Sequence, residues 1–315
     1  MTMNCSVTAS APGSLMLLGE HAVLHGKLAL VGATNLRIHV ALTPRADRRI
    51  VLRSNLGRAE MSLDRLRTTK PFRFVVAAIG LKKARLPTGF NLVIRSDFSH
   101  RVGLGSSAAV TVATLAALSA WTSGRVSRAR LLADGIRVIR GVQGLGSGAD
   151  IAASVFGGIV AYRARPLSVR RVADSCPITV IYSGSKRPTP EVVRLVERAR
   201  RRRPRLFRAV YDLMDLSSDI AAWAIRGRCW REFGEVLNIN QGLMAAIGVS
   251  NAKLDAIVGA LRSDPGIFGA KISGSGLGDC VVGLGRARRR RWPHLALPAA
   301  LSGTGIQVLR KGRRS

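Results

Sequence analysis

The chain has 315 residues, of which 47% are hydrophobic and 22% are charged, and its mean hydropathy is +0.16. This length and composition suit a compact protein with one large core or two smaller ones, and they exclude a disordered or fibrous chain. The formal net charge of +32 attracts any polyanion, so nucleic-acid binding is the first rival function to weigh.

The densest runs of arginine lie at residues 198–205, 286–292 and 310–314. These runs contain almost no interleaved aromatic residues, and only 5% of the chain is aromatic. Bases in single strands usually stack on aromatic side chains, and no nucleic-acid motif accompanies the runs. We therefore expect a basic, solvated surface that attracts acidic substrates rather than a dedicated nucleic-acid binder.

The longest nearly uncharged stretch, residues 108–124, is at or below the length that spans a bilayer, and it contains several Thr and Ser. The N-terminus lacks a basic region followed by an apolar core. We therefore expect no membrane segment and a cytoplasmic location. The cysteines occur singly, without the spacing of a zinc site or a disulfide framework, which predicts buried thiols at Cys5, Cys176, Cys229 and Cys280.

In the first half of the chain, hydrophobic periodicity predicts alternating strands and helices. Strands are expected at residues 15–18, 29–43, 49–54 and 91–96, and helices at 72–82, 108–122 and 127–138. A glycine-rich loop at residues 141–148 follows.

The second half begins with a short apolar strand at residues 178–182, after which Thr189-Pro190-Glu191 is expected to cap a helix running toward residue 200. Further helices are expected at residues 206–225, 230–247 and 251–261, and strands at 269–273, 279–284 and 305–309. The pattern is α+β. Charged residues and Pro166 interrupt it between residues 163 and 174, which predicts two domains, 1–168 and 169–315.

A glycine-rich turn runs directly into an apolar helix at Gly103-Leu104-Gly105-Ser106-Ser107-Ala108-Ala109. Such a turn offers free N–H groups and the positive end of a helix dipole, which favour phosphate. The alternative is an ordinary helix that Ser106 caps. The spacing matches neither of the two common nucleotide-binding fingerprints, so a third kind of phosphate loop is needed.

Two other glycine-rich segments lie far away in the sequence, at residues 10–30 (with Gly19-Glu20-His21-Ala22-Val23) and at residues 269–280. The ordered trio resembles the galactokinase, homoserine kinase, mevalonate kinase and phosphomevalonate kinase (GHMP kinase) superfamily over nearly the whole chain, and residues 10–30 are most similar to mevalonate kinases. The resemblance implies two lobes, an N-terminal one with a left-handed βαβ unit and a C-terminal ferredoxin-like one, with the active site in the cleft between them. It also implies ATP and Mg²⁺ as cofactors and phosphorylation of the primary hydroxyl of mevalonate, a small anionic hydroxy acid.

The resemblance also implies site residues. Asp150, in a Ser-Gly-x-Asp motif, would be catalytic, accepting the proton of the substrate hydroxyl or orienting that hydroxyl; the alternative is that it caps a helix starting at residue 151. Glu20 would accept from a substrate hydroxyl, and His21 would donate to a carboxylate or carbonyl oxygen. The ATP phosphates would lie on Gly103, Leu104, Gly105, Ser106, Ser107 and Ala108, the magnesium on Ser107, and the substrate against Glu20, His21, Ser147, Gly274 and Ser275.

The chain departs from the family pattern at several positions. Residues 136–140 contain no carboxylate where the family has a magnesium-binding glutamate, so Asp134 is one alternative. Ser14 stands where mevalonate kinases carry a lysine; Lys27, Lys186 or an arginine are alternatives for that charge. Arg101 lies just before the phosphate loop and suits a phosphate clamp. Asp279 stands where relatives often show glycine.

Other functions remain open at this point. The Gln143-Gly144 opening resembles some phosphomevalonate kinases, although the spacing to Asp150 is one residue shorter and matches mevalonate kinases. A catalytically silent sensor on this fold and a basic nucleic-acid binder are the non-enzyme alternatives, and fold alone does not decide between them. A homodimer is also left open.

Overall fold

The computed structural model describes residues 5–289 and 291–311. Within these ranges the strands form two sheets, one of eight strands and one of four. The large sheet contains β1 (Ser6–Leu18), β2 (Ala29–Pro44), β3 (Arg49–Ser54), β4 (Gly57–Ser62), β5 (Phe90–Ser96), β6 (Ile159–Ala164), β7 (Leu167–Ala173) and β12 (Gln307–Lys311). The small sheet contains β8 (Ile178–Tyr182), β9 (Ile267–Ser273), β10 (Cys280–Gly285) and β11 (Leu295–Leu297).

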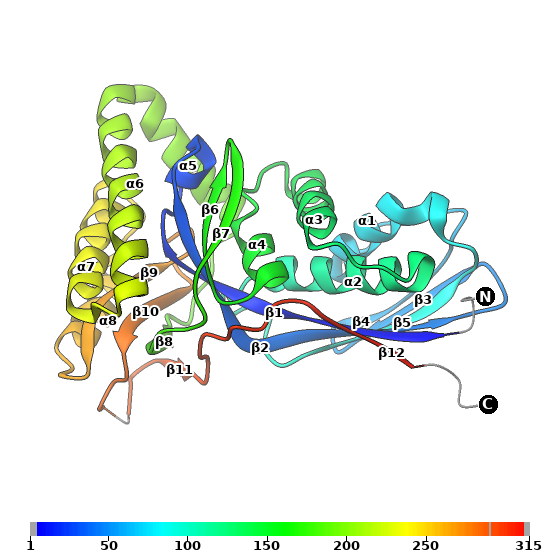
Figure 1. Ribbon diagram of the computed structural model, residues 1–315. Coiled ribbons are helices and arrows are strands. Elements are labelled where there is room, and N and C mark those ends of the chain that lie inside the picture. The colour runs from blue at the N-terminus through cyan, green and yellow to red at the C-terminus, as the bar shows by residue number, and fades with distance from the viewer. Residues whose placement is uncertain (1–4, 290, 312–315) are drawn as a thin grey trace.

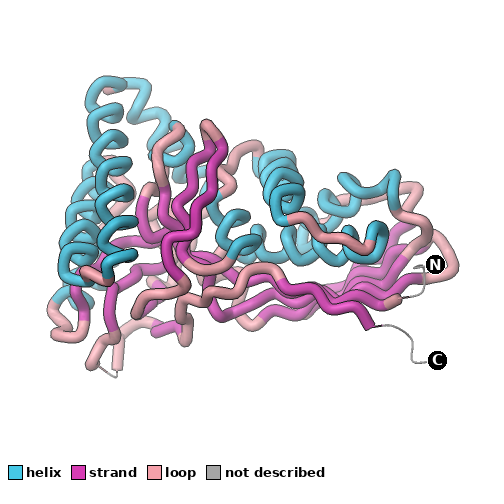
Figure 2. Tube along the Cα trace, viewed as in Figure 1, coloured by secondary structure: helices cyan, strands magenta, loops and turns pink. Residues whose placement is uncertain are grey.

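The large sheet has the order β12-β1-β2-β5-β3-β4, with β6 and β7 branching from β2. Strands β3 and β5 are parallel, and the other pairs are antiparallel. The small sheet is antiparallel in the order β11-β8-β10-β9. The two sheets define two lobes, which Figure 2 shows as separate groups of strands with helices on both.

Helices cover one side of each sheet. In Figure 1 the first four helices lie along the large sheet, and the last four gather at the left beside the small sheet. Their bounds are α1 (Arg73–Lys82), α2 (Ser106–Ser123), α3 (Arg128–Gln143), α4 (Ala149–Phe156), α5 (Thr189–Arg202), α6 (Pro204–Gly227), α7 (Trp230–Ala246) and α8 (Ala252–Arg262). None of the helices in the described ranges is long and apolar enough to cross a membrane.

The predicted α+β class is confirmed, and the main differences from the expected elements are strands. β1 begins at Ser6 rather than at residue 15, because Pro12 and Gly13 sit at a bulge within a continuous strand. β4, β6, β7 and β11 were not predicted. β4, β7 and β11 are largely exposed and lack an alternating apolar face, whereas β6 is a short, mostly buried run without alternation. The boundary predicted between residues 168 and 169 falls inside β7, which pairs with β6 in the large sheet. Sheet membership therefore changes after β7, between Ala173 and Ile178.

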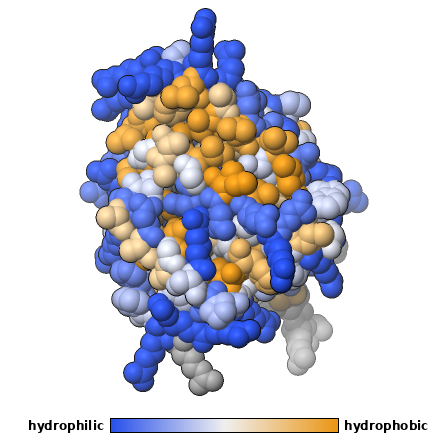
Figure 3. All heavy atoms as spheres, turned by 90° about the vertical axis from the view of Figure 1, so that its left-hand side faces the viewer, coloured by the Kyte–Doolittle hydropathy of each residue, from blue (hydrophilic) through white to orange (hydrophobic). Residues whose placement is uncertain are grey.

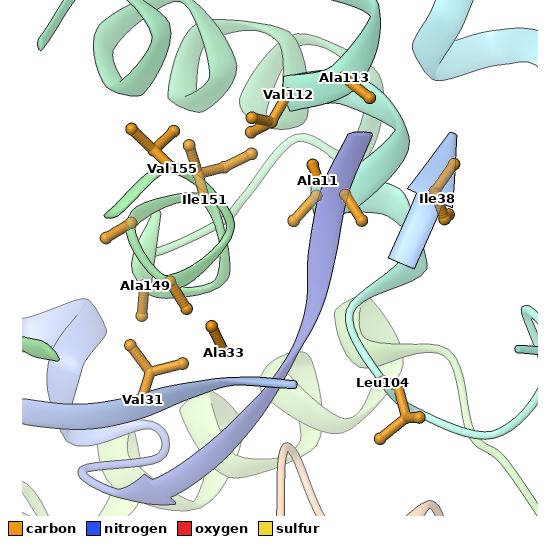
Figure 4. Packing of buried hydrophobic residues seen from close by; sticks show 14 of the residues in the cluster. Ala11, Val31, Ala33, Ile38, Leu104, Val112, Ala113, Ala149, Ile151 and Val155 are labelled. Atoms are coloured by element: carbon orange, nitrogen blue, oxygen red, sulfur yellow. The ribbon is translucent and has the colours of Figure 1, made fainter. Parts of the chain in front are cut away.

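The core of the first lobe holds α4 firmly in place. In Figure 4, Ala149 of α4 lies close to Val31 and Ala33 of β2, and Ile151 of α4 lies close to Val112 of α2. These side chains are almost completely buried. Because interiors are close-packed, the start of α4 has little freedom to move relative to the sheet and α2.

Polar contacts join the two lobes. The carboxylate of Asp215 on α6 accepts from the N–H of Leu28 at 2.7 Å and pairs with Arg163 at 3.0 Å. Ser273 Oγ, at the end of β9, donates to the carbonyl of Met16 on β1 at 2.9 Å. These contacts fix the walls of the space between the lobes.

Candidate active site

A cavity of about 1580 Å³ lies between the lobes and brings the three glycine-rich segments together. Its lining contains all but one of the residues expected at the site, namely Glu20, His21, Gly103, Gly105, Ser106, Ser107, Ala108, Ser147, Asp150, Gly274 and Ser275. The exception is Leu104, whose side chain is buried in the core while its carbonyl accepts from the N–H of Ser14 at 3.1 Å. Leu104 therefore shapes the loop and would meet a phosphate only through its backbone.

The glycine-rich turn is not a conventional helix cap. Gly105 is the N-cap of α2 with φ 62°, in the left-handed region that glycine favours, and α2 begins at Ser106. No side chain makes a capping hydrogen bond here, which removes the alternative that Ser106 is simply a cap. Ser106 and Ser107 are half-exposed in the cavity. The start of a long helix with hydroxyls beside it is well suited to an anion.

Asp150 does not cap its helix either. α4 begins at Ala149 after Gly148, and no side-chain capping bond is present. Instead, Asp150 Oδ1 accepts a hydrogen bond from Ser14 Oγ at 2.7 Å. Ser14 follows the β1 bulge, and a bulge commonly re-aims a side chain next to an active site. Burial raises the pKa of Asp150, whereas the Ser14 hydrogen bond and the charge of Lys186 lower it.

Ser14 also contacts the phosphate loop. A Cβ placed on Gly105 would lie 1.9 Å from Ser14 Oγ, so only glycine leaves room for the hydroxyl. The loop before α2, the bulge of β1 and the first turn of α4 therefore converge on one point. This convergence places the Asp150 carboxylate in the same cavity as the candidate phosphate site.

Glu20 has a partner that the motifs did not reveal. Its carboxylate pairs with the ammonium of Lys271 on β9, and both side chains are almost fully buried. Burial lowers the pKa of Lys271, and the charge of Glu20 opposes that shift. Glu20 Oε2 has no hydrogen-bond partner, which leaves it as an acceptor for a ligand. The sequence does carry one sign of this pair, because Lys271 is a charged residue between the apolar residues Ala270 and Ile272 of a strand.

His21 holds a backbone conformation that non-glycine residues rarely adopt, with φ 59°. Its Nε2 lies 2.9 Å from the carbonyl oxygen of Ser275, so Nε2 carries the hydrogen of this bond. Burial lowers the pKa of His21, which favours the neutral ring. The buried Nδ1 then has no partner and can only accept, so His21 suits a substrate hydroxyl better than the carboxylate expected from the sequence.

Asp279 and Lys186 complete the second-lobe wall of the cavity. Asp279 has φ 63°, its Oδ1 has no hydrogen-bond partner, and it lies against Gly103, whose Cβ would be 2.7 Å from that oxygen. Lys186 Nζ lies 3.8 Å from Asp279 Oδ1 and donates to the carbonyl of His100 at 3.3 Å. Burial raises the pKa of Asp279 to about 6, with Lys186 opposing the shift.

Two residues considered as replacements for the lysine and the glutamate of the family, Lys27 and Asp134, lie outside the cavity. Lys27 pairs with Asp212 at 2.5 Å, and Asp134 pairs with Lys82 at 2.6 Å. Neither Lys27 nor Asp134 lines the cavity. Arg101 does line it, as expected for a residue beside a phosphate site.

The oxygen groups of the cavity fit a magnesium ion that is held mainly by a nucleotide. The described part of the chain contains no group of three or more His, Cys, Asp or Glu that could hold a metal. The Ser107 hydroxyl and the carboxylates of Asp150 and Asp279 line the cavity. Mg²⁺ prefers oxygen ligands and commonly takes only one or two from protein, with phosphate oxygens and waters as the rest. This donor set therefore suits Mg²⁺ that arrives with ATP.

Comparison with known proteins gives a consistent result. A family model for the GHMP kinase N-terminal domain matches residues 73–158, and one for the GHMP kinase C-terminal domain matches residues 221–291. A mevalonate kinase of Archaeoglobus fulgidus is 35% identical over 92% of this chain and 96% of its own length. One of Pyrococcus abyssi is 32% identical over 90% of both chains.

A solved structure with the same fold is that of the Methanococcus jannaschii mevalonate kinase. It superposes with a TM-score of 0.75 at 24% identity, covering 89% of this chain and 90% of the other. The fold of this chain is therefore one that a known kinase also has.

Proposed function

The chain belongs to the mevalonate kinase family of the GHMP kinases, and we propose that it transfers the γ-phosphoryl group of ATP to the primary hydroxyl of mevalonate. The observation that carries this proposal is the placement of Asp150. Its carboxylate lies in the same cavity as the start of α2 and accepts from Ser14 at 2.7 Å. A carboxylate so placed can accept the proton of an attacking hydroxyl or orient that hydroxyl.

The other residues of the cavity would bind the ATP phosphates, the magnesium ion and the substrate. The backbone of residues 103–108 and the Ser106 and Ser107 hydroxyls would bind the ATP phosphates, with Ser107 also reaching the magnesium ion. When bound, Mg²⁺ neutralises charge on the phosphate oxygens. The substrate would lie against Glu20 and His21, whose Oε2 and Nδ1 are unpartnered acceptors, and against Ser147, Gly274 and Ser275.

Release of ADP from ATP and magnesium tests this function, with mevalonate, phosphomevalonate and galactose offered separately. We expect turnover with mevalonate, and a loss of about 10²–10⁴-fold in kcat for Asp150→Asn, the range that a general base supplies. Turnover with phosphomevalonate instead of mevalonate would move the acceptor to a phosphorylated substrate. Turnover with none of the three would favour the sensor or nucleic-acid alternatives.

A homodimer through α6 is proposed for the assembly. Leu206, Leu213, Leu216, Ile220 and Trp223 follow one another at intervals of seven, three, four and three residues, and each is 37–59% exposed. This is the spacing of a coiled-coil seam. Figure 3 shows a broad apolar area with a hydrophilic rim on the face formed by the left-hand side of Figure 1, where α6 and α7 lie.

A second copy suits this face because the seam is complementary to itself. In an antiparallel pair, Leu213 of one copy meets Leu216 of the other, and Leu206 meets Trp223. The five side chains expose roughly 500 Å² per copy, close to the apolar share of the ~800 Å² that each partner buries in a standard interface.

Light scattering during size-exclusion chromatography tests the dimer. The native protein is expected at twice the chain mass of 33.7 kDa. Leu216→Glu should give a monomer, whereas Leu167→Glu, at a similarly exposed leucine on β7, should leave the dimer intact. A monomeric native protein would contradict the proposal. The cytoplasmic location expected from the sequence stays a prediction.

A further inference from the structure

A second hollow, of about 450 Å³, lies over β3, β4 and β5, which Figure 1 shows at the right-hand end of the large sheet. Ile50 and Leu52 of β3 point into the core, whereas the alternate residues of that strand line the hollow, so it lies on the opposite face of the sheet. The hollow shares no lining residue with the cavity between the lobes, and its volume is within the range of small-molecule sites. Its lining consists of Thr43, Arg45, Arg49, Val51, Arg53, Arg58, Glu60, Asn91 and Val93.

The hollow carries more positive charge than the acids around it neutralise. Asp47, just outside the lining, accepts from Arg45 and from Arg49, each at 2.7 Å. Glu60 lies 3.6 Å from Arg49 and 3.3 Å from Arg58. Four arginines against these two carboxylates leave a net charge of +2. A ligand with two negative charges would therefore complement the hollow.

Arg53 is the arginine that these ion pairs leave out. Its side chain is exposed and makes no hydrogen bond or ion pair with any residue that the structure describes. In the antiparallel register of β3 and β4, it stands directly opposite Arg58. Like charges in such a position destabilise a sheet. The sheet pairing therefore gives no reason for this pair of arginines.

Protection of a sheet edge does not explain the pair either. Charged side chains on an edge strand hinder edge-to-edge aggregation, and β4 is the edge strand that carries Arg58. Arg53, however, is on β3, which is paired with β4 on one side and with β5 on the other. A strand in that position has no free edge. A bound anion between the two guanidinium groups would account for both arginines.

We propose that the hollow binds a small molecule carrying a phosphate or diphosphate group, with Arg53 and Arg58 as its main contacts. A guanidinium group donates two parallel N–H groups to phosphate oxygens, and an anion between the two arginines would replace their repulsion by attraction. A small ligand is favoured over nucleic acid, because none of the lining residues that the structure describes is an aromatic on which a base could stack. The site is independent of the proposed kinase activity.

The test uses valine methyl groups of the full chain as local reporters in NMR spectra. Val51 and Val93 line the hollow, whereas Val110 lines the cavity between the lobes, just after the phosphate loop. The resonances are assigned by their loss in Val51→Ile, Val93→Ile and Val110→Ile. Inorganic diphosphate is the probe. It should shift the Val51 and Val93 resonances saturably, with a dissociation constant of its own that differs from the one seen at Val110.

Substitution of Arg53 should act on one of the two sites. Arg53→Gln should weaken the titration seen at Val51 about tenfold or more, because a charge-assisted contact is lost, and should leave the titration at Val110 unchanged. Arg53→Lys keeps the charge but not the paired N–H groups, so its affinity should lie between the two. Arg128→Gln removes an exposed arginine of α3 that lines neither space, and it should change neither titration.

The ligand-free variant separates a binding role from a structural one. Without diphosphate, the melting temperature of Arg53→Gln should be no lower than that of the native protein, because the repulsion from Arg58 is gone. A lower melting temperature would mean that Arg53 stabilises the sheet, and the proposal would be wrong.

Three results of the titration would also overturn the proposal. Absence of a saturable shift at Val51 and Val93 would mean that the hollow does not bind diphosphate. Equal shifts with sulfate at the same ionic strength would indicate an adventitious ion only. Tighter binding of a single-stranded oligonucleotide than of diphosphate at these reporters would make nucleic acid the ligand. If the native protein does not phosphorylate mevalonate, the proposed function fails, while this titration still decides whether the hollow is a site.

Discussion

The two walls of the cleft are built in different ways. The first-lobe wall consists of a bulged strand, a glycine-rich turn and the start of two helices, and it offers backbone groups, serine hydroxyls and carboxylates, among them Asp150 and Glu20. The second-lobe wall consists of the turn after β8 and the loop before β10, and it offers charged side chains, Lys186 and Asp279. Lys271 stands behind this wall, paired with Glu20.

This difference separates the groups that bind phosphate from the groups that influence the ionisation of Asp150. Backbone groups and hydroxyls at a helix start suit phosphates without titrating. Burial raises the pKa of Asp150; the charge of Lys186 on the second-lobe wall opposes this shift, and the charge of Glu20 on the first-lobe side adds to it. Substitutions on the two walls should therefore have different kinds of effect.

Lys271→Met should be the most damaging of these substitutions to stability. It would leave the Glu20 carboxylate buried without a counter-charge, and breaking a buried pair in this way costs about 3–5 kcal/mol. Urea unfolding at neutral pH measures the loss. The double variant with Glu20→Gln should recover part of the stability, because the orphaned charge is then gone. A loss below 1 kcal/mol in the single variant would show that the pair contributes little to the second-lobe wall.

Asp279→Asn should change how stability depends on pH. In the folded protein the pKa of Asp279 is raised from 3.8 to about 6, so the native state binds this proton more tightly than the unfolded state does. The group's contribution is full below pH 4 and is lost as the pH rises through 6. The variant should lose less stability between pH 4.5 and 7 than the native protein, by roughly 2 kcal/mol. If the free energy of unfolding depends on pH in the same way in the two proteins, the pKa of Asp279 is not raised in the folded state.

The two walls were also not equally predictable from sequence. The phosphate loop follows from a local pattern, glycines directly before an apolar helix. Asp150 was identified from the resemblance of its Ser-Gly-x-Asp motif to the family, and the residues of that motif are also neighbours in the chain. The Glu20–Lys271 and Lys186–Asp279 pairs join segments far apart in sequence, so no spacing rule links them. The same holds for the hydrogen bond from Ser14 to Asp150. It depends on a β-bulge in β1 at Pro12-Gly13, a residue pair that is more typical of a loop than of a strand. Helices with strong periodicity were predicted well, whereas exposed strands such as β7 were not.

Gly105→Ala tests the first-lobe wall at the point where its three segments meet. The Cβ would lie 1.9 Å from Ser14 Oγ, and the residue would keep a positive φ of 62°. Gly144→Ala is the matched control, since Gly144 has φ 74° but nothing within 4 Å of its Cβ. Both should lose about 1–2 kcal/mol from backbone strain. Only Gly105→Ala should also weaken binding of an ATP analogue, measured by calorimetry, because the loop must move away from Ser14. Equal binding by the two variants would mean that the contact does not shape the phosphate site.

Ser14→Ala should have the smallest effect and separates a hydrogen bond from a charge. The substitution removes the 2.7 Å donor to Asp150 but changes no charge, so kcat should fall about tenfold, in line with roughly 1.4 kcal/mol for a hydrogen bond to an ionised group. Affinity for ATP and the stability of the fold should hardly change, and Ser6→Ala at the far end of the same strand should behave like the native protein. The effect on the acidic limb of the pH profile should be smaller than that of Lys186→Met, because a neutral hydroxyl compensates a buried carboxylate less than an ammonium does. If the acidic limb of the pH profile shifts more in Ser14→Ala than in Lys186→Met, the ionisation of Asp150 is controlled mainly from the first-lobe wall. The proposed difference between the two walls would then be wrong.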